Sequence, residues 1–153
     1  MEPRILIVDD HEIVREGVRS LLANMRPKWD ICGEASNGVE AIDAISKLRP
    51  DVVILDITMP NMSGFDVAAR LRDLGMATRI LFFTMHDSES LPTEVRKTGA
   101  AGFVLKSEAA RNLVRAIETV QGGGTFFGSP QSGKPGKDVN LGMLFLRLNY
   151  WPA

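Results

Sequence analysis

The sequence contains a single cysteine, Cys32, so no disulfide can form within the chain, which agrees with a protein of the reducing cytosol. It also lacks an excess of charge, because 18 Lys and Arg residues stand against 19 Asp and Glu residues. That balance gives no sign of a general nucleic-acid or membrane-surface binder. No apolar run reaches the ~18 residues that a membrane-spanning helix needs. The first apolar run is too short for a signal peptide, since Asp9 and Asp10 interrupt it. We therefore expect a cytoplasmic location and no membrane partner.

Apolar residues make up 44% of the 153 residues, which excludes a disordered chain. The length allows one domain with a hydrophobic core, with or without a short appendage. Five short segments read as strands and alternate with amphipathic helical patterns; the strands are expected at 4–8, 29–35, 52–55, 79–83 and 102–105. This alternation predicts an α/β fold, in which a mostly parallel sheet carries helices on both faces.

The regular alternation ends near residue 121, where three glycines follow the last helical pattern. We assign residues 1–125 to the domain, residues 126–138 to a linker rich in Gly, Pro and Ser, and residues 139–153 to a short apolar tail. The tail is too short to span a bilayer and too small to be a second domain. Packing onto the domain, docking onto a partner, and a foreign sequence from truncation or fusion all stay open.

Polar side chains follow four of the expected strands at the point where each strand ends. Asp9 and Asp10 follow the first strand, Asp56 the third, Thr84 the fourth and Lys106 the fifth. In an open parallel sheet, ligands bind at the carboxyl ends of the strands, so we expect these side chains to share one cleft. Crowded carboxylates repel one another, and a hard divalent cation such as Mg²⁺ would offset that repulsion.

Such a cleft is suited to receiving a phosphoryl group. Asp56 is the natural nucleophile, since carboxylates form acyl-phosphates. Lys106 and the cation would neutralise the phosphoryl oxygens, and Thr84 would donate a hydrogen bond to an attached phosphoryl group, which makes a switch. The alternative is that the acids are ordinary helix caps. That reading fits one such Asp but not this set at separate strand ends.

These residues, together with two longer phrases, resemble the receiver domain of two-component response regulators. The phrases are Leu-Asp-Ile-Thr-Met-Pro-Asn-Met-Ser-Gly, which contains Asp56, and Gly-Ala-Ala-Gly-Phe-Val-Leu-Lys, which ends at Lys106. The resemblance spans residues 3–125 and implies a flavodoxin-like, doubly wound sheet of five parallel strands in the order 2-1-3-4-5. The segment Val-Asp-Asp-His-Glu-Ile-Val-Arg-Glu-Gly is similar to the NarL/FixJ subfamily.

The resemblance also implies roles for individual residues. Asp56 accepts a phosphoryl group from a sensor histidine kinase, and the chain catalyses only this transfer to itself. Asp10, Asp56 and the backbone carbonyl of Thr58 bind Mg²⁺ directly, while Asp9 acts largely through water. Lys106 contacts the phosphoryl group.

A switch is implied as well. Thr84 moves toward the phosphoryl group, and the aromatic side chain of Phe103 turns inward behind it. Association, including a homodimer, is expected through the face made by the fourth helix, the fifth strand and the fifth helix. The output would be transcription in a longer protein.

NarL/FixJ members usually carry a C-terminal helix-turn-helix domain that binds DNA, and such a domain needs roughly 60 residues. Residues 131–153 are too few and show no basic recognition helix. DNA binding is therefore expected only if such a domain lies outside this chain.

The sequence also suggests positions for its two histidines and leaves two alternative functions open. His11 is expected to be a surface residue at a helix start. His86 and Thr58 either tune the access of water to the phosphoryl group or, for His86, belong to an ordinary loop. One alternative function is an interaction module that works without phosphate. Another is a metal-dependent phosphatase, but Thr58 stands where such enzymes commonly place a second Asp.

Overall fold

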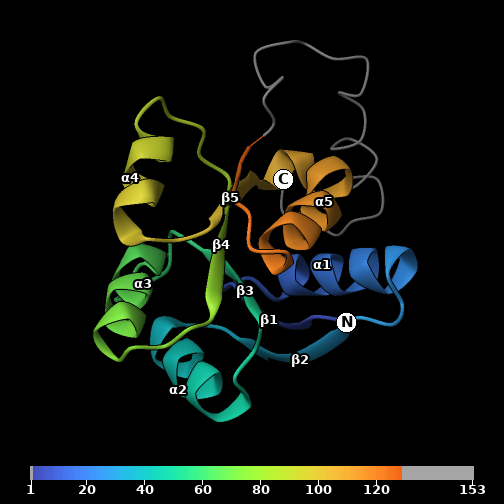
Figure 1. The fold of residues 1–153 in the computed structure, drawn as a ribbon, viewed down its shortest axis with the longest axis horizontal. Helices are drawn as coiled ribbons and strands as arrows, with labels where there is room; N and C mark the ends of the chain where they lie inside the picture. Colours follow the sequence, from blue (N-terminus) through green and yellow to red (C-terminus); the bar gives the residue numbers. More distant parts are fainter. Residues whose placement is uncertain (1, 129–153) are drawn as a thin grey trace.

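The computed structural model describes residues 2–128, in which helices and strands alternate along the chain (Figure 1). The strands are β1 (Arg4–Val8), β2 (Asp30–Ala35), β3 (Val52–Asp56), β4 (Arg79–Thr84), β5 (Gly102–Leu105) and β6 (Phe126–Phe127), and the helices are α1 (Glu12–Met25), α2 (Gly38–Leu48), α3 (Gly64–Asp73), α4 (Leu91–Thr98), the 3-10 turn η1 (Lys106–Glu108) and α5 (Ala109–Gln121). All strand pairs are parallel, in the order β2-β1-β3-β4-β5-β6. The predicted fold class and the order 2-1-3-4-5 are confirmed, with one strand added.

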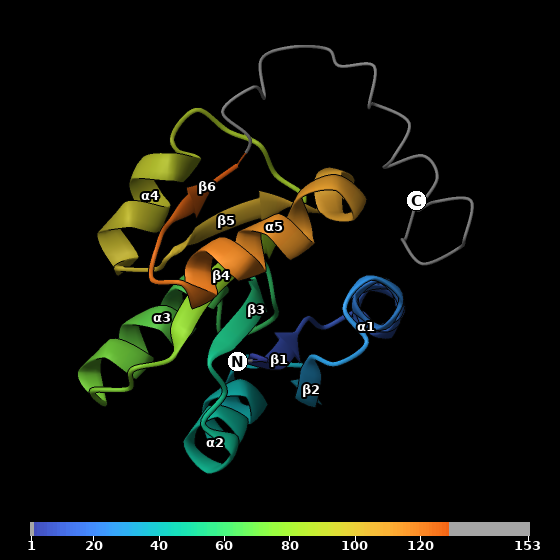
Figure 2. The same ribbon diagram turned by 45° about the vertical axis from the view of Figure 1, so that its right-hand side comes forward.

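The helices form two layers, one on each face of the sheet (Figures 1 and 2). Alternate residues of β1 show this division, because Ile5 and Ile7 pack with α1 and α5 whereas Leu6 and Val8 pack with α2, α3 and α4. All four are buried. Burial of one such side chain contributes about 1.5–3 kcal/mol, so the two cores hold the sheet from both sides.

Local signals fix the helix boundaries. The Asn37 side chain accepts a hydrogen bond from the N–H of Glu40 and caps α2. Ser63 and Asp66 form a capping box at the start of α3. Gly99 ends α4 in the left-handed region, where glycine has no Cβ penalty. No helix of the described residues is long and apolar enough to cross a membrane.

The strand β6 corrects one sequence prediction, which placed residues 126 and 127 in the linker. Phe126 pairs with Gly102 and Phe127 pairs with Phe103 of β5. Gly102 permits this pairing because a Cβ there would lie 1.8 Å from the carbonyl oxygen of Phe126, and its φ is 148°. The rest of the predicted linker from residue 129 on, and the apolar tail, lie outside the described residues.

Candidate functional site

The strand ends bring Asp9, Asp56 and Lys106 into one buried cluster, and Thr84 lies buried at the neighbouring strand end. Asp9 follows β1, Asp56 ends β3, Thr84 ends β4 and Lys106 follows β5. Their exposed fractions are 1%, 4%, 2% and 5%. Charged side chains are rarely this buried unless they are paired. The position at the carboxyl end of the sheet is the one that the sequence predicted.

Lys106 is the cation at the centre of this cluster. Its Nζ atom lies 2.7 Å from Oδ2 of Asp9 and 3.4 Å from Oδ1 of Asp56. The same ammonium lies 5.9 Å from the ring centroid of Phe83. One lysine thus bridges two buried carboxylates from different strands, while the third acid, Asp10, adds further negative charge.

Burial is the largest cause that raises the pKa of Asp56, from 3.8 to about 6. The neighbouring carboxylate of Asp9 raises this pKa further, and the ammonium of Lys106 lowers it. A carboxylate that is costly to ionise in the free protein has a strong electrostatic attraction for a cation.

The raised pKa predicts a pH-dependent loss of stability when no divalent cation is present. At pH values well below about 4, the carboxyl of Asp56 is protonated in the folded and the unfolded state, so its burial does not lower the free energy of unfolding. As the pH rises through 6, this carboxyl must ionise in the folded state, which lowers the free energy of unfolding by about 3 kcal/mol. In a chelating buffer, Asp56→Asn should therefore increase the free energy of unfolding by up to about 3 kcal/mol at pH 7 and change it little at pH 4. Urea unfolding at both pH values measures this difference, and an equal effect at both values would contradict it.

Asp10 and His11 lie at the mouth of the cluster. One oxygen atom each of Asp9, Asp10 and Asp56, together with one nitrogen of His11, all lie within 4.8 Å of one another. Oδ1 of Asp10 is buried and has no hydrogen-bond partner within the described residues. The sequence predicted His11 as an ordinary surface residue, and the imidazole is indeed half exposed. Its position against the acids is a contact that the sequence analysis missed, although the three residues are adjacent in the chain.

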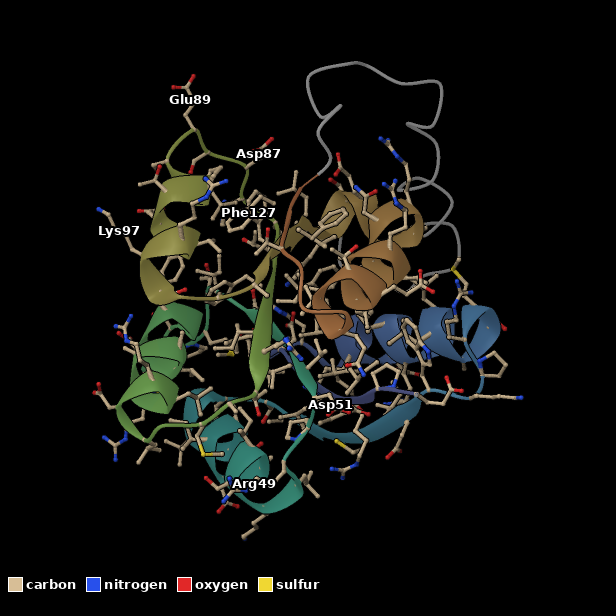
Figure 3. The ribbon with its side chains drawn as sticks, viewed as in Figure 1. Arg49, Asp51, Asp87, Glu89, Lys97 and Phe127 are labelled. Atoms are coloured by element: carbon tan, nitrogen blue, oxygen red, sulfur yellow. The ribbon has the colours of Figure 1, made fainter. Side chains whose placement is uncertain are left out.

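Thr84 holds the loop that follows β4. Its Oγ1 accepts a hydrogen bond of 3.2 Å from the backbone N–H of His86. The imidazole of His86 and the side chain of Thr58 are exposed. Figure 3 shows this loop, through Asp87 and Glu89, at the opposite end of the molecule from Arg49 and Asp51, which precede β3. Thr84 therefore connects the buried cluster with an exposed loop.

Phe103 is buried and covered by the added strand. Its ring contacts the ring of Phe127 edge-to-face, with centroids 6.0 Å apart. The guanidinium of Arg96, from α4, lies 4.2 Å from the ring centroid of Phe127. Figure 3 shows Phe127 beside that helix. The sequence analysis did not predict this stack, because it had no strand at residues 126 and 127.

Two further residues support the cluster without belonging to it. Gly64 starts α3 so close to β3 that a Cβ would lie 2.3 Å from the carbonyl oxygen of Asp56, so only glycine fits there. Arg15 of α1 donates from Nη1 to the carbonyl oxygen of Asp9 at 2.7 Å and from Nε to Glu34 at 2.9 Å. These contacts fix the backbone that presents Asp9 and Asp56, and no sequence motif indicates the role of Arg15.

Comparisons with known proteins agree with this site. The family described as "Response regulator receiver domain" matches residues 5–118. The transcriptional regulatory protein DegU of Brevibacillus brevis is 37% identical over 123 residues, which cover 80% of this chain and 52% of that protein. The nitrate/nitrite response regulator protein NarL of Escherichia coli K12 is 35% identical over 119 residues, which cover 78% of this chain and 55% of that protein.

The fold comparison gives the same result. The crystal structure of a LuxR-family two-component response regulator from Aurantimonas sp. SI85-9A1 superposes with a TM-score of 0.78 at 33% identity, covering 97% of this chain and 99% of that one. This chain belongs to the family of response regulator receiver domains. Within that family its relatives are of the NarL, DegU and LuxR type, as the resemblance implied.

The family has a general chemistry. Receiver domains are phosphorylated on an aspartate and generally bind Mg²⁺ at an acidic pocket. They are not conventional enzymes, and they interact with sensor histidine kinases. The acids of this chain fit such an ion, because three carboxylates converge and Oδ1 of Asp10 is buried with no hydrogen-bond partner among the described residues. The chain spans about half the length of the curated relatives that it matches.

Proposed function

We propose that this chain is a phosphorylation switch in which Asp56 accepts the phosphoryl group. The observation that carries the proposal is the pairing of buried Asp56 with buried Lys106, 3.4 Å apart, inside a group of acids at the carboxyl end of the sheet. A sensor histidine kinase is the proposed donor. An oxygen of Asp56 attacks the phosphorus and the bond between phosphorus and the donor nitrogen breaks. The electron pair of that bond stays on the nitrogen, which takes a proton from water as the imidazole leaves.

The other residues of the site are proposed to hold the metal ion and to neutralise the charge of the phosphoryl group. Asp10, Asp56 and the backbone carbonyl of Thr58 are the proposed direct ligands of Mg²⁺, and Asp9 acts through water. When bound, Mg²⁺ supplies positive charge to the phosphoryl oxygens. Lys106 supplies a second positive charge, because its ammonium already contacts Asp56 and Asp9. The chain catalyses only this transfer to its own side chain.

The proposed switch runs from the phosphoryl group to the surface. The hydroxyl of Thr84 donates a hydrogen bond to a phosphoryl oxygen, and this movement displaces the loop whose His86 N–H now donates to Thr84 Oγ1. The aromatic ring of Phe103 then turns inward behind Thr84 as the second residue of the switch. The side chains of Thr58 and His86 are proposed to tune the access of water to the phosphoryl group.

The proposal also includes association and output. These are a homodimer through the α4-β5-α5 face and transcriptional output through a DNA-binding domain outside this chain. The cytoplasmic location stays a prediction.

The experiment that tests the proposal is labelling with a small acyl-phosphate donor, followed by intact-mass spectrometry. We expect the mass of one added phosphoryl group in the presence of Mg²⁺ and none when a chelator replaces the ion, because the acids otherwise repel the incoming phosphate. Restored labelling after Mg²⁺ is added back is the control for chain integrity. Equal labelling with and without the ion would contradict the proposal.

A further inference from the structure

The donor set at the mouth of the cluster is not made of oxygen alone. Nδ1 of His11 lies 3.1 Å from Oδ1 of Asp9 and 3.1 Å from Oδ1 of Asp10. Two ligand atoms in adjacent positions around an octahedral ion, each at ~2.1 Å from it, are ~3.0 Å apart. Nδ1 of His11 therefore already has the spacing of a neighbouring ligand to Oδ1 of Asp10, which belongs to a proposed direct ligand of the ion.

Local structure explains why the imidazole faces the acids. His11 is the N-cap residue of α1, but its side chain makes no capping hydrogen bond to that helix. Its backbone carries the cap instead, since the carbonyl oxygen accepts from the N–H groups of Val14 and Arg15. The backbone N–H of His11 donates to Oδ1 of Asp9 at 2.9 Å. The side chain is thus held against the acids rather than committed to the helix.

Only one of the two short nitrogen contacts is a hydrogen bond. Nδ1 shares a hydrogen bond with Oδ1 of Asp9, whereas Oδ1 of Asp10, equally near, has no hydrogen-bond partner in the described part of the chain. In the tautomer protonated at Nε2, a bound cation would satisfy this buried oxygen and the lone pair of Nδ1 together. The imidazole is 55% exposed, so an ion can reach Nδ1 from solvent.

We propose that Nδ1 of His11 is an additional protein ligand of the divalent-cation site. The site therefore binds nitrogen-preferring first-row ions such as Co²⁺ or Ni²⁺ as alternatives to Mg²⁺. The inference rests on the metal site of the proposed function. Mg²⁺ prefers oxygen ligands and keeps several waters, so it gains little from an imidazole. Imidazole suits the later first-row ions, whose affinity for a nitrogen-containing site rises from Mn²⁺ toward Cu²⁺. His11 is thus a determinant of which metal is bound.

The test is titration calorimetry of the full chain, free of any histidine tag, with Co²⁺ and with Mg²⁺ chloride. His11→Ala should weaken Co²⁺ binding by at least about tenfold, on the order of what disturbing a ligand shell costs, and change Mg²⁺ binding less than about twofold. The ratio of the Co²⁺ affinity to the Mg²⁺ affinity is the decisive quantity, because a general structural defect lowers both affinities and leaves their ratio unchanged. His11→Gln, which keeps a polar side chain at the helix start, should give the same ratio.

The absorption bands of bound Co²⁺ provide an independent signal, since nitrogen is a stronger-field ligand than oxygen. These bands should move to longer wavelength in His11→Ala. His86→Ala removes the only other histidine of the chain and should leave both the bands and the Co²⁺ affinity unchanged.

The alternative role of His11 predicts a change of opposite sign. If the imidazole served only as a hydrogen-bond donor to the acids, its removal would free their oxygens and raise the affinity for Co²⁺ and Mg²⁺ alike. That result, or equal affinities in His11→Ala and the unaltered chain, would overturn the proposal and leave the Mg²⁺ site intact. Absence of binding of either ion to the unaltered chain would overturn both this inference and the metal site of the proposed function.

Discussion

Asp56→Asn is expected to abolish incorporation of a phosphoryl group from a small acyl-phosphate donor. The amide removes the carboxylate that forms the acyl-phosphate, while its similar shape preserves the contact region around Lys106. Asp9 and Asp10 remain beside it, so the variant also tests whether a neighbouring acid can replace the nucleophile. Intact-mass spectrometry after incubation with donor and Mg²⁺ measures the result.

Asp43→Asn is the matched control for this change. Asp43 lies on the exposed surface of α2, where its Oδ2 atom pairs with Lys47, and its substitution should leave labelling at the level of the unaltered chain. Circular dichroism of Asp56→Asn checks that the fold is retained. A phosphorylated species of the same mass in Asp56→Asn would refute the assignment of the acceptor.

Lys106→Met is expected to slow phosphorylation by at least about 100-fold, because removal of one preorganised charge partner of a transition state typically costs 10²–10³ in rate. The methionine keeps the length and the apolar stem of the side chain but not the ammonium that contacts Asp9 and Asp56. The time course of labelling at saturating Mg²⁺ gives the rate.

The same substitution should also lower stability in a chelating buffer, since breaking a buried ion pair from one side costs about 3–5 kcal/mol. Lys97→Met is the control, because the Lys97 side chain points away from α4 in Figure 3 and is exposed. A labelling rate for Lys106→Met within a factor of about two of the control would contradict the role of the ammonium in transfer.

Much of the fold and the location of the cluster could be predicted from the sequence. The run that ends at Asp56 is apolar on both faces, and such runs form the interior strands of parallel sheets. Once several such strands are placed, their carboxyl ends share one edge of the sheet, so Asp9, Asp56, Thr84 and Lys106 are brought together by topology alone. Distances such as the 2.7 Å between Lys106 and Asp9 needed the structure.

The features that the sequence did not reveal depend on tertiary contacts. A two-residue strand such as β6 has no periodicity, and its pairing depends on the missing Cβ of Gly102 against Phe126. The stack of Phe103, Phe127 and Arg96 depends on that strand in turn. The orientation of His11 is a side-chain rotamer at a helix start, which composition and spacing do not determine.

The position of the phosphoryl group on the chain is the most direct test of the central claim. After labelling in the presence of Mg²⁺, the aspartyl phosphate is trapped by reduction with borohydride, and the peptides are sequenced by tandem mass spectrometry. The account predicts modification at Asp56, dependent on Mg²⁺ and lost in Asp56→Asn. Modification at Asp9, Asp10 or His11 instead, or at Asp56 without any need for the ion, would contradict it.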